Sequence, residues 1–480
     1  MLFLPLLFPL AGGVCAFLIK KERARAFCVM AALILTLASA AALCLTAPEP
    51  VTLLAIGGGI ELRLGLDGMG RFFILLMSAV WTVVAPFAFP YIRHEGHDRQ
   101  FFGFYLLTLL SLMGLCVSRN AVTLYMFYEL MTLLSVPLVL HNGTERARYA
   151  ALKYLGYSVA GASLALFGLF LLYRHGGAGD FSAGGILTMA GGKQSLLVLA
   201  WFLMTLGFGC KAGMIPMQAW LTTAHPVAPA PASAVLSGII TKAGVLGIIR
   251  VTFFTFGTEM LVGTWAQKVL MILALLTVLT GSMLAYKEKH FKKRLAYSTV
   301  SQVSYALFGL LLLTPLGALG ALLQVFFHAV AKDVLFLSAG AMIYRTGREN
   351  AAEYLGIGRE MPVTTWCFAI GALSLIGIPP TGGYFSKWYL ATSAIEHYGV
   401  LGIVGAGVLL LSALLTAGYL LPIVARGFFP GRDFIPQKRE VGAAMLVPMI
   451  LLALAALIPG LFSGLLAAPL SLLASSLFSF

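Results

Sequence analysis

The fold of the chain is decided by residues 206–250, which read LGFGCKAGMIPMQAWLTTAHPVAPAPASAVLSGIITKAGVLGIIR. This stretch places two lysines, Lys211 and Lys242, inside runs that are otherwise apolar, with several prolines between them. Because proline lacks a backbone donor and clashes with the preceding turn, we expect Pro216 to break the first helix. A broken helix is tolerated in a membrane only where its freed backbone groups meet protein or a water-filled cavity. A lysine in such a place is costly and normally faces the bundle interior. The stretch therefore predicts the centre of an ion pathway.

The composition around this stretch indicates an all-α polytopic membrane protein. Of the 480 residues, 60% are hydrophobic and 10% are charged. Long apolar runs with few charges recur along the chain, which is typical of a bundle of transmembrane helices. We expect about 14 spans, each near the roughly 20 residues that a bilayer requires. Their approximate limits are 2–19, 26–46, 70–92, 101–118, 120–140, 149–173, 195–224, 230–254, 264–285, 297–313, 317–344, 363–397, 400–425 and 441–463.

The segments outside these spans are short, and none is long enough for a soluble domain. The N-terminal run lacks the basic start of a secretory signal, so we expect it to be retained as the first helix. The gap at 47–69 includes GGGIELRLGLDGMG, for which we expect a short hairpin on the outer face. The tail at 464–480 is apolar and rich in serine, and we expect it to lie along the interface.

The basic residues predict the orientation in the cell membrane. By the positive-inside rule, the loops richer in lysine and arginine face the cytoplasm. Both termini are then expected on the outer face, and the net charge of +14 reflects topology rather than nucleic-acid binding. The odd-numbered loops hold Lys20, Lys21, Arg23, Arg25, Arg93, Arg99, Arg146, Arg148, Lys287, Lys289, Lys292, Lys293, Arg294, Arg345, Arg348, Arg359, Arg426, Arg432, Lys438 and Arg439. The even-numbered loops and their edges hold Arg63, Arg71, Arg119, Arg174, Lys193 and Lys268.

A few ionisable side chains fall inside the spans, and they are the candidate proton pathway. Burial disfavours the charged form of such a group, and a nearby opposite charge restores it, so a buried pair can act as a switch. We expect Glu129 and Lys211, near mid-membrane on neighbouring spans, to form such a pair in at least one state. Histidine titrates in the physiological range and suits a relay step. A charge in the middle of a membrane is a functional hypothesis by default. The predicted pathway residues are Glu129, Lys211, Lys242, His328 and Lys387.

Three further residues are additional candidates with alternatives left open. Lys153 is near the inner end of the sixth span, where its side chain could instead extend to the interface. Lys332 lies one turn after His328 on the same helix face, and pairing with the adjacent Asp333 is the alternative. His225 precedes one of the prolines. His328 itself has the alternative of a hydrogen-bonded core histidine.

No cofactor is expected in this chain. Its six cysteines lie singly in apolar runs and form no CxxC pair, which favours small buried hydrophobic residues over disulfides or iron–sulfur ligands. The sequence also contains no P-loop, no GxGxxG motif and no metal-ligand spacing, so ATP-driven transport has no basis in it.

Two broken spans suggest an internal repeat. Both GMIPMQAW (213–220) and GIPPTGGYFSKW (377–388) interrupt an apolar run beside a lysine. Paired broken helices in the two halves of a transporter indicate inverted repeats of five helices. We therefore divide the chain into three N-terminal helices at 1–100, a first repeat at 101–254, a second, inverted repeat at 255–426, and a C-terminal helix and tail at 427–480.

At these residues the chain resembles the family of antiporter-like, proton-conducting membrane subunits. That family includes pumping subunits of respiratory complex I, large subunits of Mrp-type sodium/proton antiporters, and subunits of membrane-bound hydrogenases and formate hydrogenlyases. The resemblance is carried by FYELMTLLSVPLV (127–139), ALKYLGYS (151–158), residues 207–250, KRLAYSTVSQVSY (293–305), HAVAKDVLFLSAGAM (328–342) and GIPPTGGYFSKW (377–388).

The resemblance implies the same architecture, with a hydrated polar axis at mid-membrane. It places the family's switch glutamate at Glu129, its central lysines at Lys211 and Lys242, its eleventh-span histidine at His328 and its terminal residue at Lys387. Lysine rather than glutamate at that last position argues against one of the complex I pumping subunits. Because the chain ends at Phe480, we expect no long C-terminal lateral helix.

The leading hypothesis is a non-redox, proton-translocating subunit of an NADH:quinone oxidoreductase-like or hydrogenase-like complex. Its expected partners are homologous and smaller membrane subunits, protons or sodium ions, and the lipid bilayer. One alternative is a subunit of an Mrp-type antiporter without a redox module. A quinone-reducing catalytic subunit and a purely structural spacer are alternatives from other classes.

Overall fold

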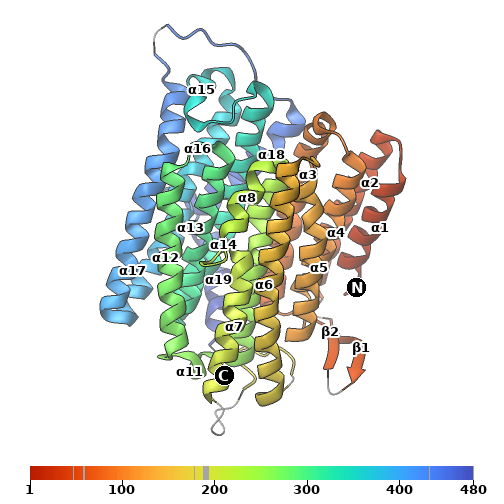
Figure 1. The fold of residues 1–480 in the computed structure, drawn as a ribbon, viewed down its shortest axis with the longest axis vertical. Coiled ribbons are helices and arrows are strands. Elements are labelled where there is room, and N and C mark those ends of the chain that lie inside the picture. The colour runs from red at the N-terminus through yellow and green to blue at the C-terminus, as the bar shows by residue number, and fades with distance from the viewer. Residues whose placement is uncertain (47, 58–59, 178, 188–193, 432, 479–480) are drawn as a thin grey trace.

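Long apolar helices with roughly parallel axes form the body of the protein (Figure 1). The computed structural model describes residues 1–46, 48–57, 60–177, 179–187, 194–431 and 433–478. Within these residues, eleven helices are long and apolar enough to cross a membrane, and three shorter apolar helices accompany them. The prediction of a helical, polytopic membrane protein is confirmed. The figure of about 14 spans, the inverted symmetry of the repeats and the domain limits stay predictions.

The long helices overlap the predicted spans and several extend a few residues beyond them, whereas the short helices Thr258–Leu261, Ile357–Glu360 and Gly464–Ser476 lie outside the spans. The first part of the chain contains α1 (Leu4–Leu18), α2 (Glu22–Leu45), α3 (Gly68–Glu95), α4 (Asp98–Cys116), α5 (Ala121–Leu140) and α6 (Glu145–His175). The middle contains α7 (Gln194–Ala212), α8 (Ala219–Val227), α9 (Ala230–Val235), the π-helical segment η1 (Leu236–Ile240), α10 (Thr241–Val251), the π-helical segment η2 (Thr252–Phe256), α11 (Thr258–Leu261) and α12 (Trp265–Lys287). The last part contains α13 (Phe291–Leu311), α14 (Pro315–Thr346), the 3-10 turn η3 (Ala351–Glu353), α15 (Ile357–Glu360), α16 (Pro362–Ile376), α17 (Gly383–Phe428), α18 (Ala443–Leu461) and α19 (Gly464–Ser476).

Polar caps in the loops set where several of these helices begin. The side chains of Asn120, Thr144, Thr264 and Thr314 each accept a hydrogen bond from a backbone N–H in the first turn of the helix that follows. A cap of this kind satisfies a donor that has no partner inside the helix. The polar residues in the short loops therefore determine where these long apolar helices begin.

Both predicted helix breaks are present. The seventh span is interrupted between Ala212, where α7 ends, and Ala219, where α8 begins. The twelfth is interrupted between Ile376 and Gly383, and the kink inside α17 at Tyr398 and Gly399 separates it from the thirteenth. The two π-helical segments in the eighth span were not predicted.

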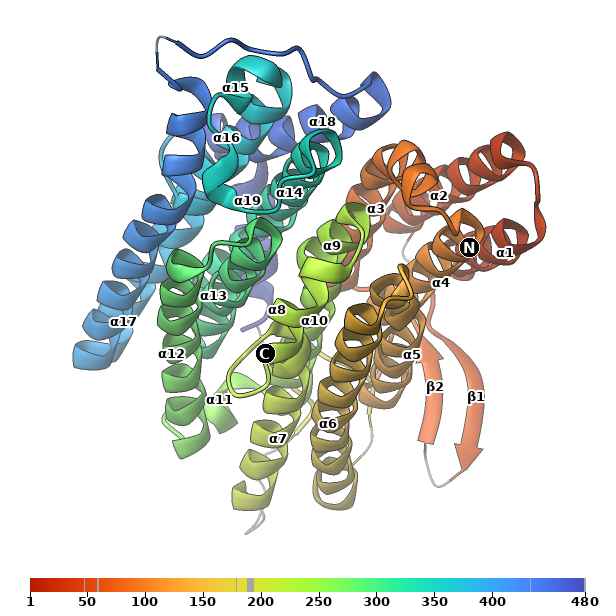
Figure 2. The same ribbon diagram turned by 45° about the horizontal axis from the view of Figure 1, so that its top comes forward.

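Two spans form the centre of the bundle. The segment Ala230–Phe256 is 100% buried over its most apolar window and α14 is 94% buried, whereas α17 is only 28% buried. Figure 2 shows the helices of residues 194–256 between α5 and α6 on one side and α12 and α13 on the other. The candidate residues Lys242 and His328 lie on these two central spans.

The predicted hairpin and the α15 segment lie at opposite ends of the bundle. The antiparallel hairpin of β1 (Val51–Gly57) and β2 (Ile60–Leu64) confirms the predicted hairpin and lies at the lower end in Figure 1. The α15 segment and the connection from α17 to α18 lie at the upper end. Of the basic residues used for topology, Lys193 and Arg432 lie outside the described residues.

The C-terminal tail differs from the expectation of an interfacial segment. It forms α19, which packs against α14 with Leu470 and Ala474 buried. The ring of Phe478 contacts the ring of Phe253 at a centroid distance of 5.4 Å. One face of the tail therefore packs against the central helix, whereas Leu465 and Leu472 on the rest of α19 are exposed.

Candidate functional site

Lys211 is held by hydroxyl groups of the neighbouring helix α6. Its side chain, in the last turn of α7, is 0% exposed. Its ammonium donates hydrogen bonds to Tyr154 Oη at 2.9 Å and Ser158 Oγ at 2.8 Å. It also lies over the Tyr154 ring, 4.1 Å from the centroid. Ser135 of α5 bonds the same tyrosine hydroxyl at 2.7 Å. This arrangement satisfies a buried cation with polar atoms and an aromatic face.

Glu129 does not pair with Lys211 in this structure. Within the described residues, no carboxylate lies within 4.0 Å of the Lys211 ammonium. Glu129 is half-buried on α5, and its buried Oε1 has no hydrogen-bond partner in the described part of the chain. It lines a lateral pocket of about 390 Å³ beside Leu130, Leu133 and the hairpin residues Leu53 and Leu62. The predicted charge pair is thus not formed in this conformation, because the lysine points to α6.

Lys242 and His328 are in direct contact at the centre of the bundle. The Lys242 ammonium lies 2.5 Å from His328 Nδ1. It also donates to the Ser237 carbonyl at 2.9 Å, in the π-helical segment η1. The wider turn of a π-helix leaves carbonyl groups without their usual partner one turn earlier. The other ring nitrogen of His328, Nε2, is buried and has no partner among the described residues. A proton on Lys242 therefore has an acceptor next to it, and that acceptor has a second, open nitrogen.

Lys332 pairs with helix α13 and not with Asp333. Its ammonium donates to the Leu295 carbonyl at 2.9 Å and to the hydroxyl of Ser298. The alternative of a pair with Asp333 is therefore not realised, because adjacent residues on a helix point to different sides. Asp333 is 0% exposed, and both of its carboxylate oxygens lack a hydrogen-bond partner within the described residues.

His225 is a buried histidine near this group. It lies in α8, and its ring stacks on Phe336 of α14 with centroids 4.8 Å apart. Neither ring nitrogen has a hydrogen-bond partner in the part of the chain that the structure describes. The structure therefore places this predicted candidate beside the central helix α14, with free hydrogen-bonding capacity.

Lys387 stabilises the break in the twelfth span. Its ammonium donates to the carbonyl oxygens of Leu375 at 2.5 Å and Ile376 at 2.8 Å. These carbonyls belong to the last turn of α16, where no helical donor follows. A cation at a helix C-terminus also complements the helix dipole. Lys387 therefore lies in the predicted position and makes contacts that hold the broken helix.

An amide network that sequence reasoning missed lies between the central helices and Lys387. Gln324, one turn before His328, donates to Gln302 Oε1 at 3.1 Å. Its own Oε1 accepts a hydrogen bond from Ser386 at 2.7 Å, and Ser386 precedes Lys387 in the chain. Each of these residues is an uncharged polar group inside an apolar span, and counting such residues would have found them.

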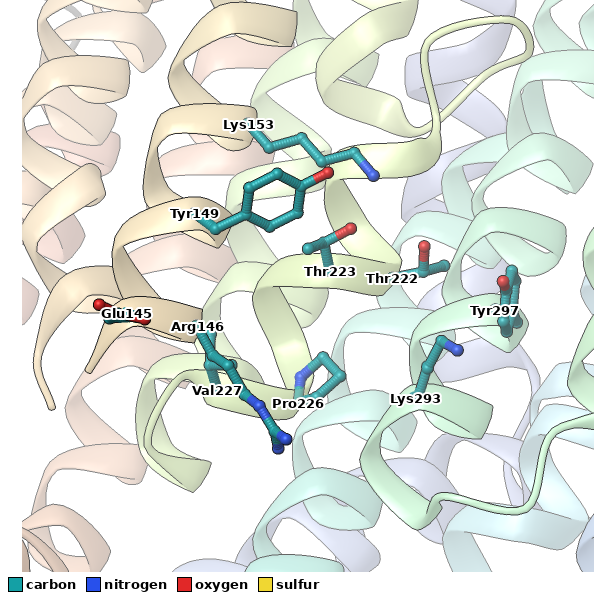
Figure 3. A pocket seen from close by; sticks show the side chains of 10 residues that line it. All are labelled: Glu145, Arg146, Tyr149, Lys153, Thr222, Thr223, Pro226, Val227, Lys293 and Tyr297. Carbon is teal, nitrogen blue, oxygen red and sulfur yellow. The ribbon is translucent and has the colours of Figure 1, made fainter. Parts of the chain in front are cut away.

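Lys153 lines a pocket instead of joining the hydrogen-bonded row. The pocket has a volume of about 630 Å³ and lies between α6, α8 and α13. Figure 3 shows Lys153 above Thr222 and Thr223, with Arg146 and Lys293 around the same space. The structure therefore separates Lys153 from the buried lysines.

Comparisons with known proteins agree on one family. The family model described as "NADH:quinone oxidoreductase/Mrp antiporter, TM" matches residues 118–416, which include every residue from Glu129 to Lys387. The chain is 32% identical to NADH-quinone oxidoreductase subunit N of Desulforudis audaxviator, over 84% of this chain and 82% of that protein. It is 29% identical to a Na(+)/H(+) antiporter subunit of Alkalihalophilus pseudofirmus, over 81% and 78% of the two chains. A chain of respiratory complex I from Thermus thermophilus with bound NADH superposes with a TM-score of 0.83 at 25% identity, covering 100% of both chains.

Proposed function

Because the chain belongs to the NADH:quinone oxidoreductase/Mrp antiporter transmembrane family, we propose that it translocates protons as one subunit of a multi-subunit, redox-driven membrane complex. The observation that carries this proposal is the contact between Lys242 and His328 on the two central spans. A lysine and a histidine placed together away from water and lipid are costly, and such groups mark ion pathways in membrane proteins.

The proposed route uses the contacts of the buried row. The imidazole of His328 takes a proton from Lys242 at Nδ1 and releases one from Nε2, so the ring relays charge without rotating. Gln324 and Ser386 lie between this ring and Lys387 and offer hydrogen-bonding groups in that direction. Lys211, with its hydroxyl partners on α6, is the corresponding station in the first half of the chain.

Energy for transport is proposed to come from other subunits. We propose a position in the plasma membrane, with both termini and the hairpin on the outer face, from the distribution of basic residues between the two ends of the bundle. Homologous and smaller membrane subunits are the proposed partners, and no cofactor is proposed for this chain. Glu129 lines a pocket with residues of α5 and the hairpin, and we propose that a neighbouring subunit contacts the switch residue there.

A second candidate is a subunit of a sodium/proton antiporter without a redox module. The similarity to the Na(+)/H(+) antiporter subunit of Alkalihalophilus pseudofirmus favours it, since that relative is matched over nearly the same share of the chain. In this case sodium ions would be exchanged for protons through the same buried row, and electron transfer would not drive the transport.

Everted membrane vesicles from the host test both candidates. Quenching of acridine orange on addition of NADH, formate or hydrogen reports redox-driven proton uptake, and reversal of an imposed gradient by sodium reports antiport. We expect uptake with an electron donor, and its loss in Lys211→Ala and Lys242→Ala with the complex still assembled. Wild-type uptake in both variants would refute the proposed pathway. A response to sodium alone would select the antiporter.

A further inference from the structure

Asp333 is a buried carboxylate for which the proposed pathway has no role yet. It lies on the central helix α14, is 0% exposed, and its two carboxylate oxygens have no hydrogen-bond partner within the described residues. An ionised carboxylate in such a place is strongly unfavourable unless a cation pairs with it. A fully buried acid that lacks a partner in one conformation therefore requires one in another, or a proton.

The backbone next to Asp333 is shaped to admit its carboxylate. Gly238 lies in η1, which packs against α14. A Cβ atom at this glycine would lie 2.0 Å from Asp333 Oδ1 and 2.5 Å from Cγ. Any larger residue would thus occupy the space of the carboxyl group. The absence of a side chain at Gly238 brings the carboxylate directly against the peptide backbone of η1.

The same turn of backbone holds the Lys242 ammonium. Ser237, the residue before Gly238, provides the carbonyl that accepts from Lys242 Nζ at 2.9 Å. The ammonium and the carboxylate therefore approach η1 at consecutive residues.

Among the described residues, three polar groups on α14 and α4 already have partners. The Lys332 ammonium is bound by α13. The hydroxyl of Tyr105, on α4, donates to the Trp81 carbonyl at 2.7 Å. His328 is the present acceptor of Lys242. Among these groups, Lys242 is the cation whose present contact with the Ser237 carbonyl lies beside the backbone that Asp333 approaches.

We propose that Asp333 is a second binding site for the Lys242 ammonium, used in alternation with His328. When Lys242 contacts His328, its proton can pass to Nδ1. When it contacts Asp333, it forms a neutral ion pair and retains its proton. No covalent bond breaks in this exchange, because the hydrogen bond moves from Nδ1 to a carboxylate oxygen. Asp333 thereby determines when Lys242 can deliver its proton, and the inference rests on the proposed proton pathway.

The test measures proton uptake per electron donor oxidised in everted vesicles that contain the whole complex. Asp333→Asn keeps the shape of the side chain and removes its charge. We expect about a tenfold loss of uptake per turnover, since a hydrogen bond to a charged group contributes at least this factor. Asp333→Glu keeps the carboxylate and is expected to recover part of the loss. The matched control is Thr205→Val, which removes another buried side-chain oxygen without a partner among the described residues.

A second readout separates the proposed role from a structural one. Infrared difference spectra of the working complex are expected to show a carboxyl band that changes during turnover and is absent in Asp333→Asn. If that variant assembles poorly, Gly238→Ala, which crowds the carboxylate in place, is expected to reduce uptake in the same direction. An equal loss in Thr205→Val, or no turnover-dependent band, would overturn the proposal.

The outcomes also separate this inference from the proposed function. If Asp333→Asn pumps like the wild type while Lys242→Ala does not, the inference fails and the pathway stands. If both variants pump like the wild type, the pathway itself fails. If the loss in Asp333→Asn occurs only in sodium buffer and not in choline buffer, the carboxylate binds sodium, and the alternation with His328 is wrong.

Discussion

Replacing Arg250 by methionine is expected to destabilise the end of the bundle that carries the hairpin. Arg250, at the end of α10, is 1% exposed. Its guanidinium donates to both carboxylate oxygens of Asp67, with Nη2 and Oδ1 2.9 Å apart. It also lies 5.1 Å from the ring centre of Phe181 and 4.7 Å from that of Phe254. Asp67 in turn caps α3 by accepting from the Gly70 N–H at 2.8 Å. The pair therefore joins two helices that are distant in sequence.

The size of the effect follows from the burial of the pair. Removing one partner of a buried ion pair costs about 3–5 kcal/mol, because the other charge is left without its partner. Arg119 lies 3.9 Å from the Asp67 carboxylate and can replace part of the interaction, so we expect the lower end of that range. The matched control is Arg93→Met, whose pair with Glu22 is 66% and 45% exposed. Exposed pairs contribute about 0–1 kcal/mol.

The loss in the free energy of unfolding is measured for both variants by unfolding the purified complex in mixed SDS and detergent micelles, followed by tryptophan fluorescence. Equal losses in the two variants, or a loss below about 1 kcal/mol for Arg250→Met, would refute the assignment of a buried, stabilising pair.

The same pair predicts a dependence on pH. Burial opposes ionisation of Asp67, but Arg250, the Gly70 N–H and Arg119 together hold the pKa of this carboxyl below its ordinary value. Because the pKa of Asp67 is lower in the folded state, the contribution of its ionised carboxylate to the stability is complete above the unfolded pKa of about 3.9. This contribution is lost as the pH falls through the folded pKa. The wild type is expected to lose more stability than Arg250→Met as the pH falls below about 4. Parallel pH profiles for the two proteins would contradict this reasoning.

Three further predictions concern the buried row and its breaks. Glu129→Gln is expected to uncouple proton uptake from the driving reaction while Glu129→Asp retains part of it, and wild-type uptake in vesicles of the first variant would make the switch assignment wrong. Gly383→Ala is expected to reduce the yield of assembled complex, because its Cβ would lie 1.9 Å from the Ser374 carbonyl oxygen; Gly156→Ala, with no atom within 4 Å, is the control for this purification. Gln324→Leu is expected to lower proton uptake several-fold, because the polar groups that are hydrogen-bonded to Gln324 lose their partner, at a cost of about 1–3 kcal/mol each. Unchanged uptake would exclude the amide network from the pathway.

The helix breaks and the mid-span positions of the lysines were predictable from local sequence. Pro216 interrupts a helix whatever surrounds it, because the ring removes a donor and clashes with the preceding turn. Lys211 and Lys242 had to face protein, because the lipid interior offers no partner for a charge. The short hairpin was likewise predicted, whereas the course of α19 was not, because an apolar tail fits an interface and a bundle groove equally well.

The sequence by itself determined which segments are long and apolar enough to enter the membrane, because this follows from the length and hydrophobicity of continuous runs. Only the tertiary structure decided what each buried group contacts. Lys242 contacts His328, which is 86 positions away in the sequence, and Lys211 contacts Tyr154, which is 57 positions away. The predicted partner of Lys211 was Glu129, but in this structure the ammonium donates to Tyr154 and Ser158 of α6. Such pairings depend on how helices pack side by side, and helix packing is set by contacts over whole faces that a single span does not encode.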